Sequence, residues 1–361
     1  MGLAPNDFLV RLLDAPGPSG FETEAARVWR AEAERIAGAG AGAVHVDVVG
    51  NSWAGFHGRS GPRVLLAGHI DEIGVMATYV DDQGFVFIDG IGGWDPQVLV
   101  GQRIRFLTRC GPLLGVVGRK PIHLIKPEER DKAVKLSDLW VDVAARDRAD
   151  VERRGLRVGD PGIVDSAVVE LGESVIAARS VDNRVGAYVV LEVLRELAGD
   201  SSSAADVVAV ATAQEEIAFH GGGARPLAYQ LDPRLAIAVD VTFSSDVPDV
   251  EKKQVGDHRL GGGPVLSRGS STNAAMFERL VEIASREGIP YSVQATPRAS
   301  STDADAIYLQ RGGIATALIS IPNRYMHSPH QMIDLRDLHG AVRLIAGFCR
   351  SLTETDEFIP R

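Results

Sequence analysis

Three short apolar runs, each leading into side chains of metal-ligating types, constrain the fold of this chain more than any other feature. Continuous apolar runs of this length are typical of strands buried on both faces, as in a parallel sheet. The carboxyl ends of parallel strands meet at one edge of an open α/β sheet, where sites form. The runs are Arg63–Gly68 ahead of His69, Asp206–Ala213 ahead of Gln214–Glu216, and Leu235–Val241, which contains Asp240.

Segments with helical periodicity alternate with these strands. The apolar residues between Phe8 and Leu13 share one helix face, and the prolines and glycines of Pro16–Gly20 end that helix. The alternation predicts an α/β fold with a mixed, largely parallel sheet sandwiched by helices. Further helices are expected at Glu22–Ile36, Asp182–Leu197, Thr272–Glu287, Ala304–Gln310 and Leu335–Leu352, and further strands at Val44–Val49, Trp53–Phe56, Tyr291–Ala295 and Ile314–Ile319.

Between residues 72 and 164, short strands and glycine-rich turns such as Asp81–Gly84 replace the helices. Frequent turns between short strands are typical of a small β-barrel or sandwich. We predict that 72–164 form an inserted, small β-barrel domain, and that 1–71 together with 165–361 form one discontinuous main domain. The expected strands of the insert are Val75–Val80, Phe85–Ile88, Arg103–Leu107 and Leu113–Val117.

Charge and terminal sequence exclude several classes of partner. The formal net charge of −10 argues against a general nucleic-acid binder, which needs a clustered basic surface. No apolar run approaches the ~18 residues of a membrane span, and the N-terminus lacks the pattern of a signal peptide. Cys110 and Cys349 lie far apart, which indicates free thiols in a reducing compartment. We expect a cytoplasmic protein with no nucleic-acid or membrane partner.

Five stretches contain side chains that commonly bind metals. Each alone has a structural explanation: a lone histidine is usually hydrogen-bonded, Asp182 suits a helix N-cap, and Glu215 with Glu216 suits a solvated turn. Asp240 resists such an explanation, because an unpaired charge that follows a buried strand is costly. The stretches are AGHIDEIG around His69, SVDNRVG around Asp182, QEE at Gln214–Glu216, AVDVT around Asp240 and YMHSPH around His327.

Taken together, the stretches favour a metal centre. Two histidines and three carboxylates suit a pair of divalent cations. One carboxylate can bridge two metals about 3.5–4 Å apart. The adjacent Glu215 and Glu216 offer two separate functions, since one can bind metal while its neighbour acts as a base.

In this order the motifs resemble those of the tetrahedral-aminopeptidase family of metallopeptidases, which includes glutamyl and deblocking aminopeptidases. The resemblance covers nearly the whole chain and implies a metallopeptidase fold. Besides the stretches around His69 and Asp182, the matching segments are VVGRKPIHLIKPEERDKAVKLSDLWVDV in the insert, ATAQEEIAFHGG, AVDVTFSSDVP, STDADAIYLQRGGIAT and RYMHSPHQMIDL.

The resemblance implies a role for each candidate residue. His69 binds one metal, Asp182 bridges, Asp240 completes the first site, Glu216 and His327 bind the second metal, Glu215 is the general base and Asp71 orients the His69 imidazole. The implied cofactors are two divalent metal ions, zinc first, with cobalt or manganese as alternatives. The implied reaction removes the N-terminal residue from short peptides with a bridging water that Glu215 activates. Dimers formed through the insert, and a tetrahedral dodecamer, are the implied assembly.

The chain departs from the family pattern at several positions. Asn183 stands where many relatives have a second aspartate, which predicts tuning rather than loss of the centre. His330 follows His327 by three residues, but the motif assigns the ligand to His327. The other departures are Ala218 and His220 after the glutamate pair and Ser300 and Ser301 before Thr302–Asp303, and the histidines without ligand context are His45, His57, His123, His258 and His339.

Three alternatives remain at this stage. A glycosidase needs two carboxylates that flank a sugar, rather than a cluster of histidines and carboxylates, and a chelator would distinguish the two. A scaffold on a retired peptidase fold would have lost ligands, and all five are present. A metallo-deacylase or dipeptidase would share the metal chemistry, so only substrate tests separate it.

Overall fold

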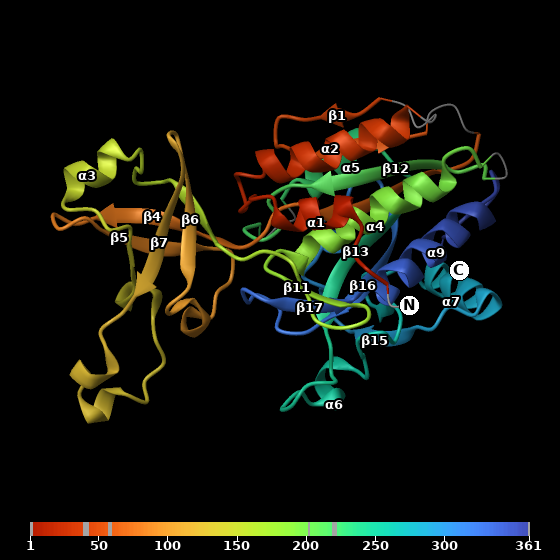
Figure 1. Cartoon of the computed structure of the whole chain (residues 1–361). Coiled ribbons are helices and arrows are strands. Elements are labelled where there is room, and N and C mark those ends of the chain that lie inside the picture. Colours follow the sequence, from red (N-terminus) through yellow and green to blue (C-terminus); the bar gives the residue numbers. More distant parts are fainter. Residues whose placement is uncertain (1–2, 39–42, 57–59, 201–202, 219–221, 360–361) are drawn as a thin grey trace.

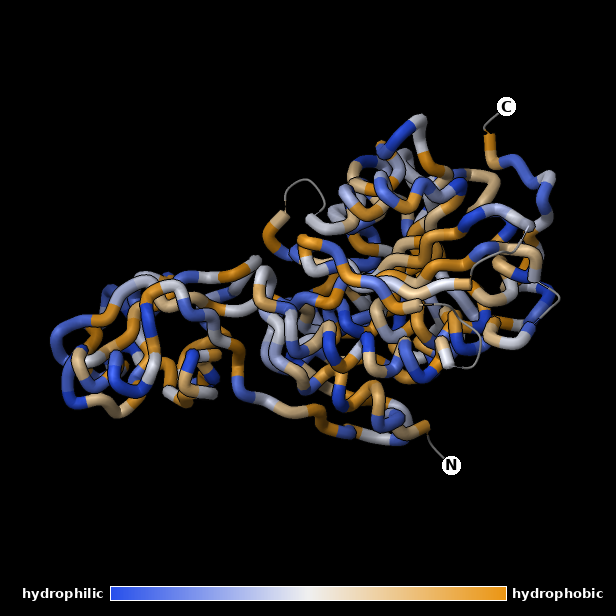
Figure 2. Tube along the Cα trace, turned by 90° about the horizontal axis from the view of Figure 1, so that it is seen from above, coloured by the Kyte–Doolittle hydropathy of each residue, from blue (hydrophilic) through white to orange (hydrophobic). Residues whose placement is uncertain are grey.

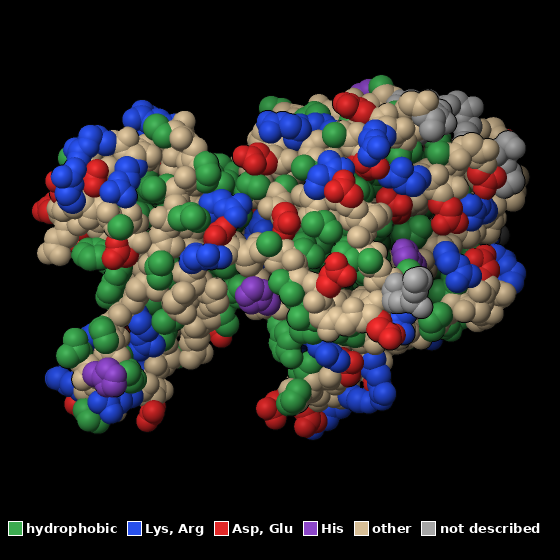
Figure 3. Space-filling model, viewed as in Figure 1, with side chains coloured by type: hydrophobic (Ala, Val, Ile, Leu, Met, Phe, Trp, Pro, Cys, Tyr) green, Lys and Arg blue, Asp and Glu red, His purple; other side chains and the backbone are tan. Residues whose placement is uncertain are grey.

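A computed structural model describes residues 3–38, 43–56, 60–200, 203–218 and 222–359. An α/β portion and a closed six-stranded barrel lie beside each other (Figure 1). On the face seen in Figure 3, basic and acidic side chains are interspersed over both portions, and a hollow separates the lower part of the barrel from the α/β portion. None of the helices in the described ranges is long and apolar enough to cross a bilayer.

The main sheet has eight strands in the order β1-β2-β12-β3-β13-β16-β14-β15. The four pairings β12–β3, β3–β13, β13–β16 and β14–β15 are parallel, and the other three are antiparallel. This arrangement confirms the predicted mixed, largely parallel sheet. The strands are β1 (His45–Val46), β2 (Ser52–Gly55), β3 (Arg63–His69), β12 (Asp206–Thr212), β13 (Leu235–Phe243), β14 (Val265–Gly269), β15 (Ser292–Thr296) and β16 (Ala315–Asn323).

Helices cover both faces of this sheet. Alternate residues of β3 pack into different clusters: Val64 and Leu66 lie in one, and Leu65 and Ala67 in the other. Both clusters are apolar, so apolar segments fill the centre of the α/β portion in Figure 2. The first cluster contains α1 (Asp7–Asp14), α2 (Thr23–Ala37), α4 (Val181–Leu197), α7 (Ala274–Glu287) and α9 (Leu335–Ser351), and the second contains α5 (Ala224–Leu231) and α8 (Asp303–Ile307).

Two glycines let α4 approach β3 closely beside the predicted site. A Cβ on Gly68 would lie 2.3 Å from the carbonyl carbon of Gly186, which is closer than atoms can pack. The first turn of α4 carries Asp182, and the residue after Gly68 is His69. The close approach therefore brings two predicted ligands from distant parts of the chain together.

The barrel encloses its own apolar cluster, which is separate from those of the main sheet. Its closed sheet confirms a barrel rather than a sandwich. That 72–164 form a separate domain stays a prediction. In barrel order the strands are β4 (Gly74–Val80), β5 (Phe85–Ile91), β8 (Trp140–Asp142), β7 (Gly111–Gly118), β6 (Arg103–Thr108) and β9 (Pro161–Val164), and α3 (Arg148–Arg153) packs on them.

Several local predictions need correction. The strand expected at Val44–Val49 is reduced to His45–Val46, because Asp47 instead accepts hydrogen bonds from three following backbone N–H groups and forms a turn. The helix expected at Ala304–Gln310 ends at Ile307. The remaining strands and α-helix are α6 (Lys252–Val255) and a small antiparallel sheet of β10 (Val169–Glu170), β11 (Val175–Ala178) and β17 (Gln331–Asp334). These elements, like α3, α5 and β14, were not anticipated from the sequence.

Candidate metal centre

The predicted site residues gather at the carboxyl edge of the main sheet. His69 is the last residue of β3 and pairs in register with Thr212, the last residue of β12. The turn Gln214–Glu216 therefore begins beside His69. Asp240 lies near the carboxyl end of β13, the neighbour of β3 on its other side. Parallel pairing thus unites three segments that are far apart in the sequence.

His69 is buried and oriented by Asp71. Its Nδ1 lies 3.2 Å from the Asp71 backbone oxygen and 3.4 Å from Asp71 Oδ1. This leaves Nε2 directed at the centre, where Asp182 Oδ1 lies 3.2 Å away. Ligand histidines commonly have this kind of support on the second nitrogen. The orienting role expected of Asp71 is compatible with these distances and stays a prediction.

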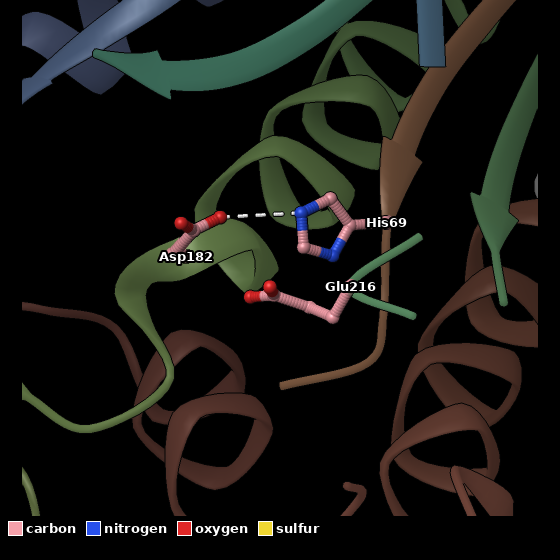
Figure 4. A group of neighbouring side chains, drawn as sticks. All are labelled: His69, Asp182 and Glu216. Atoms are coloured by element: carbon pink, nitrogen blue, oxygen red, sulfur yellow. Dashed lines mark ion pairs between the residues drawn. The ribbon is translucent and has the colours of Figure 1, made fainter. Parts of the chain in front are cut away.

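Asp182 lies between the two histidines. Its Oδ1 faces His69 Nε2, as Figure 4 shows, and its Oδ2 lies 3.4 Å from His327 Nε2. Burial alone would raise the pKa of Asp182, but hydrogen bonds from both imidazoles hold that pKa well below its usual range. A carboxylate with one oxygen on each side has the geometry that a bridging ligand needs.

His327 reaches the centre from the loop between β16 and β17, with a left-handed φ of 57°. Its Nε2 also lies 3.4 Å from Glu216 Oε2. Its Nδ1 lies 2.7 Å from the carbonyl oxygen of Gly93, which can only accept, so Nδ1 donates there. Gly93 belongs to the segment after barrel strand β5. The barrel portion therefore orients one predicted ligand.

Glu215 and Asp240 approach the same His69 nitrogen as Asp182, at a longer distance. Glu215 Oε2 and Asp240 Oδ1 are each 3.9 Å from His69 Nε2. Burial is the main reason that the pKa of Glu215 rises to about 10, with neighbouring carboxylates adding to it. Burial likewise raises the pKa of Asp240 well above its usual range. The expected roles of Asp240 as a ligand and Glu215 as the base stay predictions.

The centre contains far more carboxylate than imidazole. Burial and the charge of Asp182 raise the pKa of Glu216, and Glu216 Oε1 is buried without a hydrogen-bond partner. Ligand atoms of His69, Asp182 and Glu216 all lie within 4.8 Å of one another. Buried carboxylates that outnumber their cationic partners are costly unless cations neutralise them. These oxygen and nitrogen donors suit divalent cations.

Asn183 has a structural role that an aspartate could not fill. Its amide nitrogen donates to the backbone oxygen of Val239 at 2.8 Å, and its amide oxygen accepts from the backbone N–H of Gly186 at 3.0 Å. An aspartate has no donor for the Val239 oxygen. The departure from the family pattern is therefore compatible with an intact centre. His57 and His220 lie outside the described residues.

Sequence reasoning missed Asp303 as a member of this centre. Its side chain is buried, one oxygen accepts a hydrogen bond from Thr212 Oγ1, and the other has no partner. Burial raises the pKa of Asp303 to about 6. Its charge in turn raises the pKa values of Glu215 and Asp240. In the sequence, Asp303 follows Thr302 at the start of a helix, where an acidic residue has an ordinary explanation. That pattern gave no sign that the carboxylate lies close enough to His69 to interact with its charge.

A hollow of about 440 Å³ opens beside Asp240. Val241 and Thr242 line it from β13, directly after Asp240, and Ser300 and Thr302 line it from the segment before Asp303. Ser300, one of the departures from the family pattern, therefore lies on the wall of this hollow. Arg298 is the single charged residue of the lining.

The comparison with family models decides the family. The model of the M42 glutamyl aminopeptidases matches residues 50–344. The chain belongs to the M42 glutamyl aminopeptidase family. It is therefore a peptide-bond hydrolase of the aminopeptidase type, and the family resemblance read from the motifs is confirmed. Membership of this metallopeptidase family also implies divalent metal ions, which the donor set described above suits.

Relatives and solved structures are similar to this protein over nearly the whole chain. A lysyl aminopeptidase of Pyrococcus furiosus is 35% identical over 352 residues, which are 97% of this chain and 98% of the relative. A TET aminopeptidase of a marine-sediment Thaumarchaeota archaeon superposes with a TM-score of 0.89 at 30% identity, over 96% of this chain and 95% of its own. The TET1 peptidase of Pyrococcus horikoshii, described as assembling into a tetrahedron or a large octahedral shell, has a TM-score of 0.81 at 28% identity and covers 95% and 98%.

Proposed function

We propose that this M42 family member is a two-metal aminopeptidase that removes the N-terminal residue from short peptides, with Glu215 as its general base. The position of Asp182 carries this proposal. Its two carboxylate oxygens face separate imidazoles at 3.2 and 3.4 Å, so the carboxylate stands between two donor sets. We assign His69 and Asp240 to one ion, Glu216 and His327 to the other, and Asp182 to both.

The described side chains fit such a pair of ions by charge and by donor type. When bound, two divalent ions polarise the scissile carbonyl and lower the pKa of an attacking water. The ions would also neutralise the buried carboxylates, which burial otherwise pushes toward the protonated form. Imidazole and carboxylate accept zinc, cobalt and manganese alike, so we propose zinc first and the other two as alternatives.

Glu215 is the residue best placed to move the proton. Its carboxylate lies 3.9 Å from His69 Nε2, at the edge of the centre, and its backbone N–H is held by Asp71. Glu215 takes a proton from the water and returns it to the nitrogen of the leaving amine. Burial of this carboxyl favours retention of the proton between the two transfers.

The hollow beside Asp240 is our candidate pocket for the substrate's N-terminal side chain. Its lining includes Val241 and Thr302, which are the sequence neighbours of Asp240 and Asp303. A substrate residue held at the centre therefore has this hollow next to its side chain. The unpaired oxygen of Asp303 and the other buried carboxylates favour a cationic group, such as a free α-ammonium. This feature supports exopeptidase rather than endopeptidase action.

Hydrolysis of aminoacyl-p-nitroanilides by metal-stripped protein, with zinc, cobalt or manganese added back, tests the proposal. We expect activity to vanish on stripping and to return with about two equivalents of metal per chain, measured by elemental analysis. The side-chain panel also reports the preferred N-terminal residue. Restoration by a single equivalent would contradict the two-metal centre. No cleavage with any metal or side chain would favour a deacylase, testable on N-acylated amino acids.

We also propose that copies associate through the barrel into dimers, and from dimers into a tetrahedral dodecamer. The relative from Pyrococcus horikoshii is described as assembling into a tetrahedron or a large octahedral shell. Barrel strand β7 turns Leu114 and Val116 outward, and Ile122 and Leu124 are exposed in the segment that follows. Light scattering that gives a stable monomer would contradict this assembly.

Two free cysteines, one of them exposed, support action in the cytoplasm, which cell fractionation tests.

A further inference from the structure

Side chains, rather than regular secondary structure, hold the turn that carries Glu215. Gln214, the residue before it, has a left-handed φ of 62°, which few residues other than glycine adopt. The backbone N–H groups of Glu215 and Glu216 donate to the two carboxylate oxygens of Asp71 at 3.1 and 3.0 Å. The N–H of Gln214 donates to Glu22 Oε1 at 3.2 Å. Two carboxylates from distant segments thus fix the backbone on both sides of the proposed base.

Glu22 uses its side chain for this contact at the expense of its own helix. It occupies the N-cap position of α2, yet it makes no side-chain capping bond there. Serine, threonine, asparagine and aspartate are the residues that cap helices well. The Glu22 side chain is instead buried, and its Oε1 also accepts from the N–H of Gly20 at 2.6 Å.

The segment that carries Glu22 is tied to the end of β3. The N–H of Gly17 donates to Glu72 Oε1 at 3.1 Å, and the N–H of Ser19 donates to the Glu72 backbone oxygen at 3.0 Å. Glu72 is itself buried and ion-paired with Arg184 at 2.8 Å and Arg179 at 2.9 Å. Glu22 therefore projects from a segment anchored beside His69 and Asp71.

We propose that Glu22 is a positioning residue for Glu215: it fixes the left-handed backbone of Gln214 and so aims the base. This inference rests on the proposed role of Glu215. A misplacement of about 1 Å at a reacting group can cost on the order of 10²-fold in rate, so a loosened turn lowers kcat without weakening substrate binding. Burial and the charge of Asp71 raise the pKa of Glu22 to about 7, so a neutral glutamine is a close substitute.

Four variants of the full-length, metal-loaded enzyme test the proposal. Glu22→Gln keeps an oxygen that can accept both N–H groups. Glu22→Asp keeps the charge and supplies a better cap, but it withdraws the carboxylate by about one methylene. Glu22→Ala removes the acceptor. Glu24→Ala is the matched control, because Glu24 is exposed in the first turn of the same helix.

We expect kcat to fall about 10- to 100-fold in Glu22→Asp and Glu22→Ala, with KM within about twofold and metal content unchanged. Glu22→Gln should recover at least half of the wild-type kcat, and Glu24→Ala should match wild type. The aspartate variant keeps the test decisive if the alanine variant does not fold. Full kcat in Glu22→Asp, a glutamine variant as slow as the aspartate variant, or loss of metal would each overturn the proposal.

Glu215→Gln, measured in parallel, separates this inference from the proposed function. Near-normal turnover by Glu215→Gln would remove the base itself, and the positioning role with it. An inactive Glu215→Gln beside fully active Glu22→Asp and Glu22→Ala would overturn the positioning role alone.

Discussion

The barrel and the α/β portion differ in what they bury. Between residues 73 and 164, all of which the structure describes, Asp150 is the single buried charged side chain, and it is paired with surface arginines. The α/β portion instead buries many charged side chains, and the largest group of them lies at one edge of its sheet. Those side chains are His69, Asp71, Glu72, Arg179, Asp182, Arg184, Asp240 and Asp303.

This difference indicates a division of labour. Burying a charge is costly unless it is paired or binds a cation, so stability alone does not favour a cluster of buried carboxylates. The barrel, with an apolar interior, is built for stability and shape. It still reaches the centre, where the Gly93 carbonyl accepts from His327 Nδ1. This hydrogen bond connects the barrel portion directly to a predicted ligand of the centre.

The largest expected effect comes from Glu215. Glu215→Gln should lower kcat by about 10²- to 10⁴-fold, because an amide cannot accept the proton. KM, metal content and the thermal midpoint should change little, since the amide has nearly the same shape. Steady-state kinetics, elemental analysis and thermal unfolding measure these quantities. A Glu215→Gln enzyme that turns over near the wild-type rate would break the assignment of chemistry to this edge.

A substitution that creates a large cavity in the barrel should lower the stability of the protein without changing its catalytic rate. Phe106 is fully buried in the barrel cluster, so Phe106→Ala should lower the free energy of unfolding by about 3–5 kcal/mol. At temperatures where the variant is folded, kcat should stay near wild type. Val158→Ala, on the exposed surface of the same portion, is the control. Denaturant unfolding and kinetics on the same samples decide it, and a parallel fall in kcat would show that the barrel does more than support.

Asp337 tests whether buried charge in the α/β portion is costly away from the centre. Burial raises its pKa to about 7, although the N–H groups of Gly261 and Gly263 donate to it. The folded pKa lies above the unfolded one, so this contribution to stability is full below about pH 4 and is lost as pH rises to about 7. The loss is at most about 4 kcal/mol.

The matched measurement is urea unfolding of wild type and Asp337→Asn from pH 4 to 8. The stability of wild type relative to the variant should decrease as pH rises through this range. Equal pH slopes would mean that Asp337 ionises normally in the folded protein.

Asn183 gives the smallest effect. Asn183→Asp replaces the side-chain amide by a carboxylate, so two oxygens would face each other at the Val239 carbonyl. We expect a loss of about 1–3 kcal/mol in unfolding free energy, with metals still bound. Urea unfolding and elemental analysis measure both. A stabilised variant would show that the added charge outweighs the lost hydrogen bond at the position next to Asp182.

Periodicity and strand-end residues carried much of the prediction. Apolar runs such as Leu235–Val241 predicted buried parallel strands because few other structures bury such runs. The barrel followed from frequent turns between short strands, which leave no room for helices. Antiparallel pairing of β14 with β16 was not predictable, since a strand's own sequence does not name its neighbour.

Part of the site was also predictable from apolar runs and the polar residues that follow them. His69 and Asp240 stand at strand ends, where polar side chains after apolar runs attract notice. The roles of the seven predicted residues stay predictions, although the structure brings all seven to one place. Glu22 and Asp303 escaped notice because each stands at a helix start, where an acidic residue already has an ordinary explanation.

By itself, the sequence determined the principal strands and helices, the family and the types of side chain available for chemistry, because periodicity and motif order are local properties of the chain. Only the tertiary structure decided that Asp182 stands between two histidines, that Gly93 of the barrel portion supports His327, and that Glu22 holds the turn before Glu215. These contacts join residues far apart in the sequence. Their distances follow from how strands pair and helices pack, which no local pattern encodes.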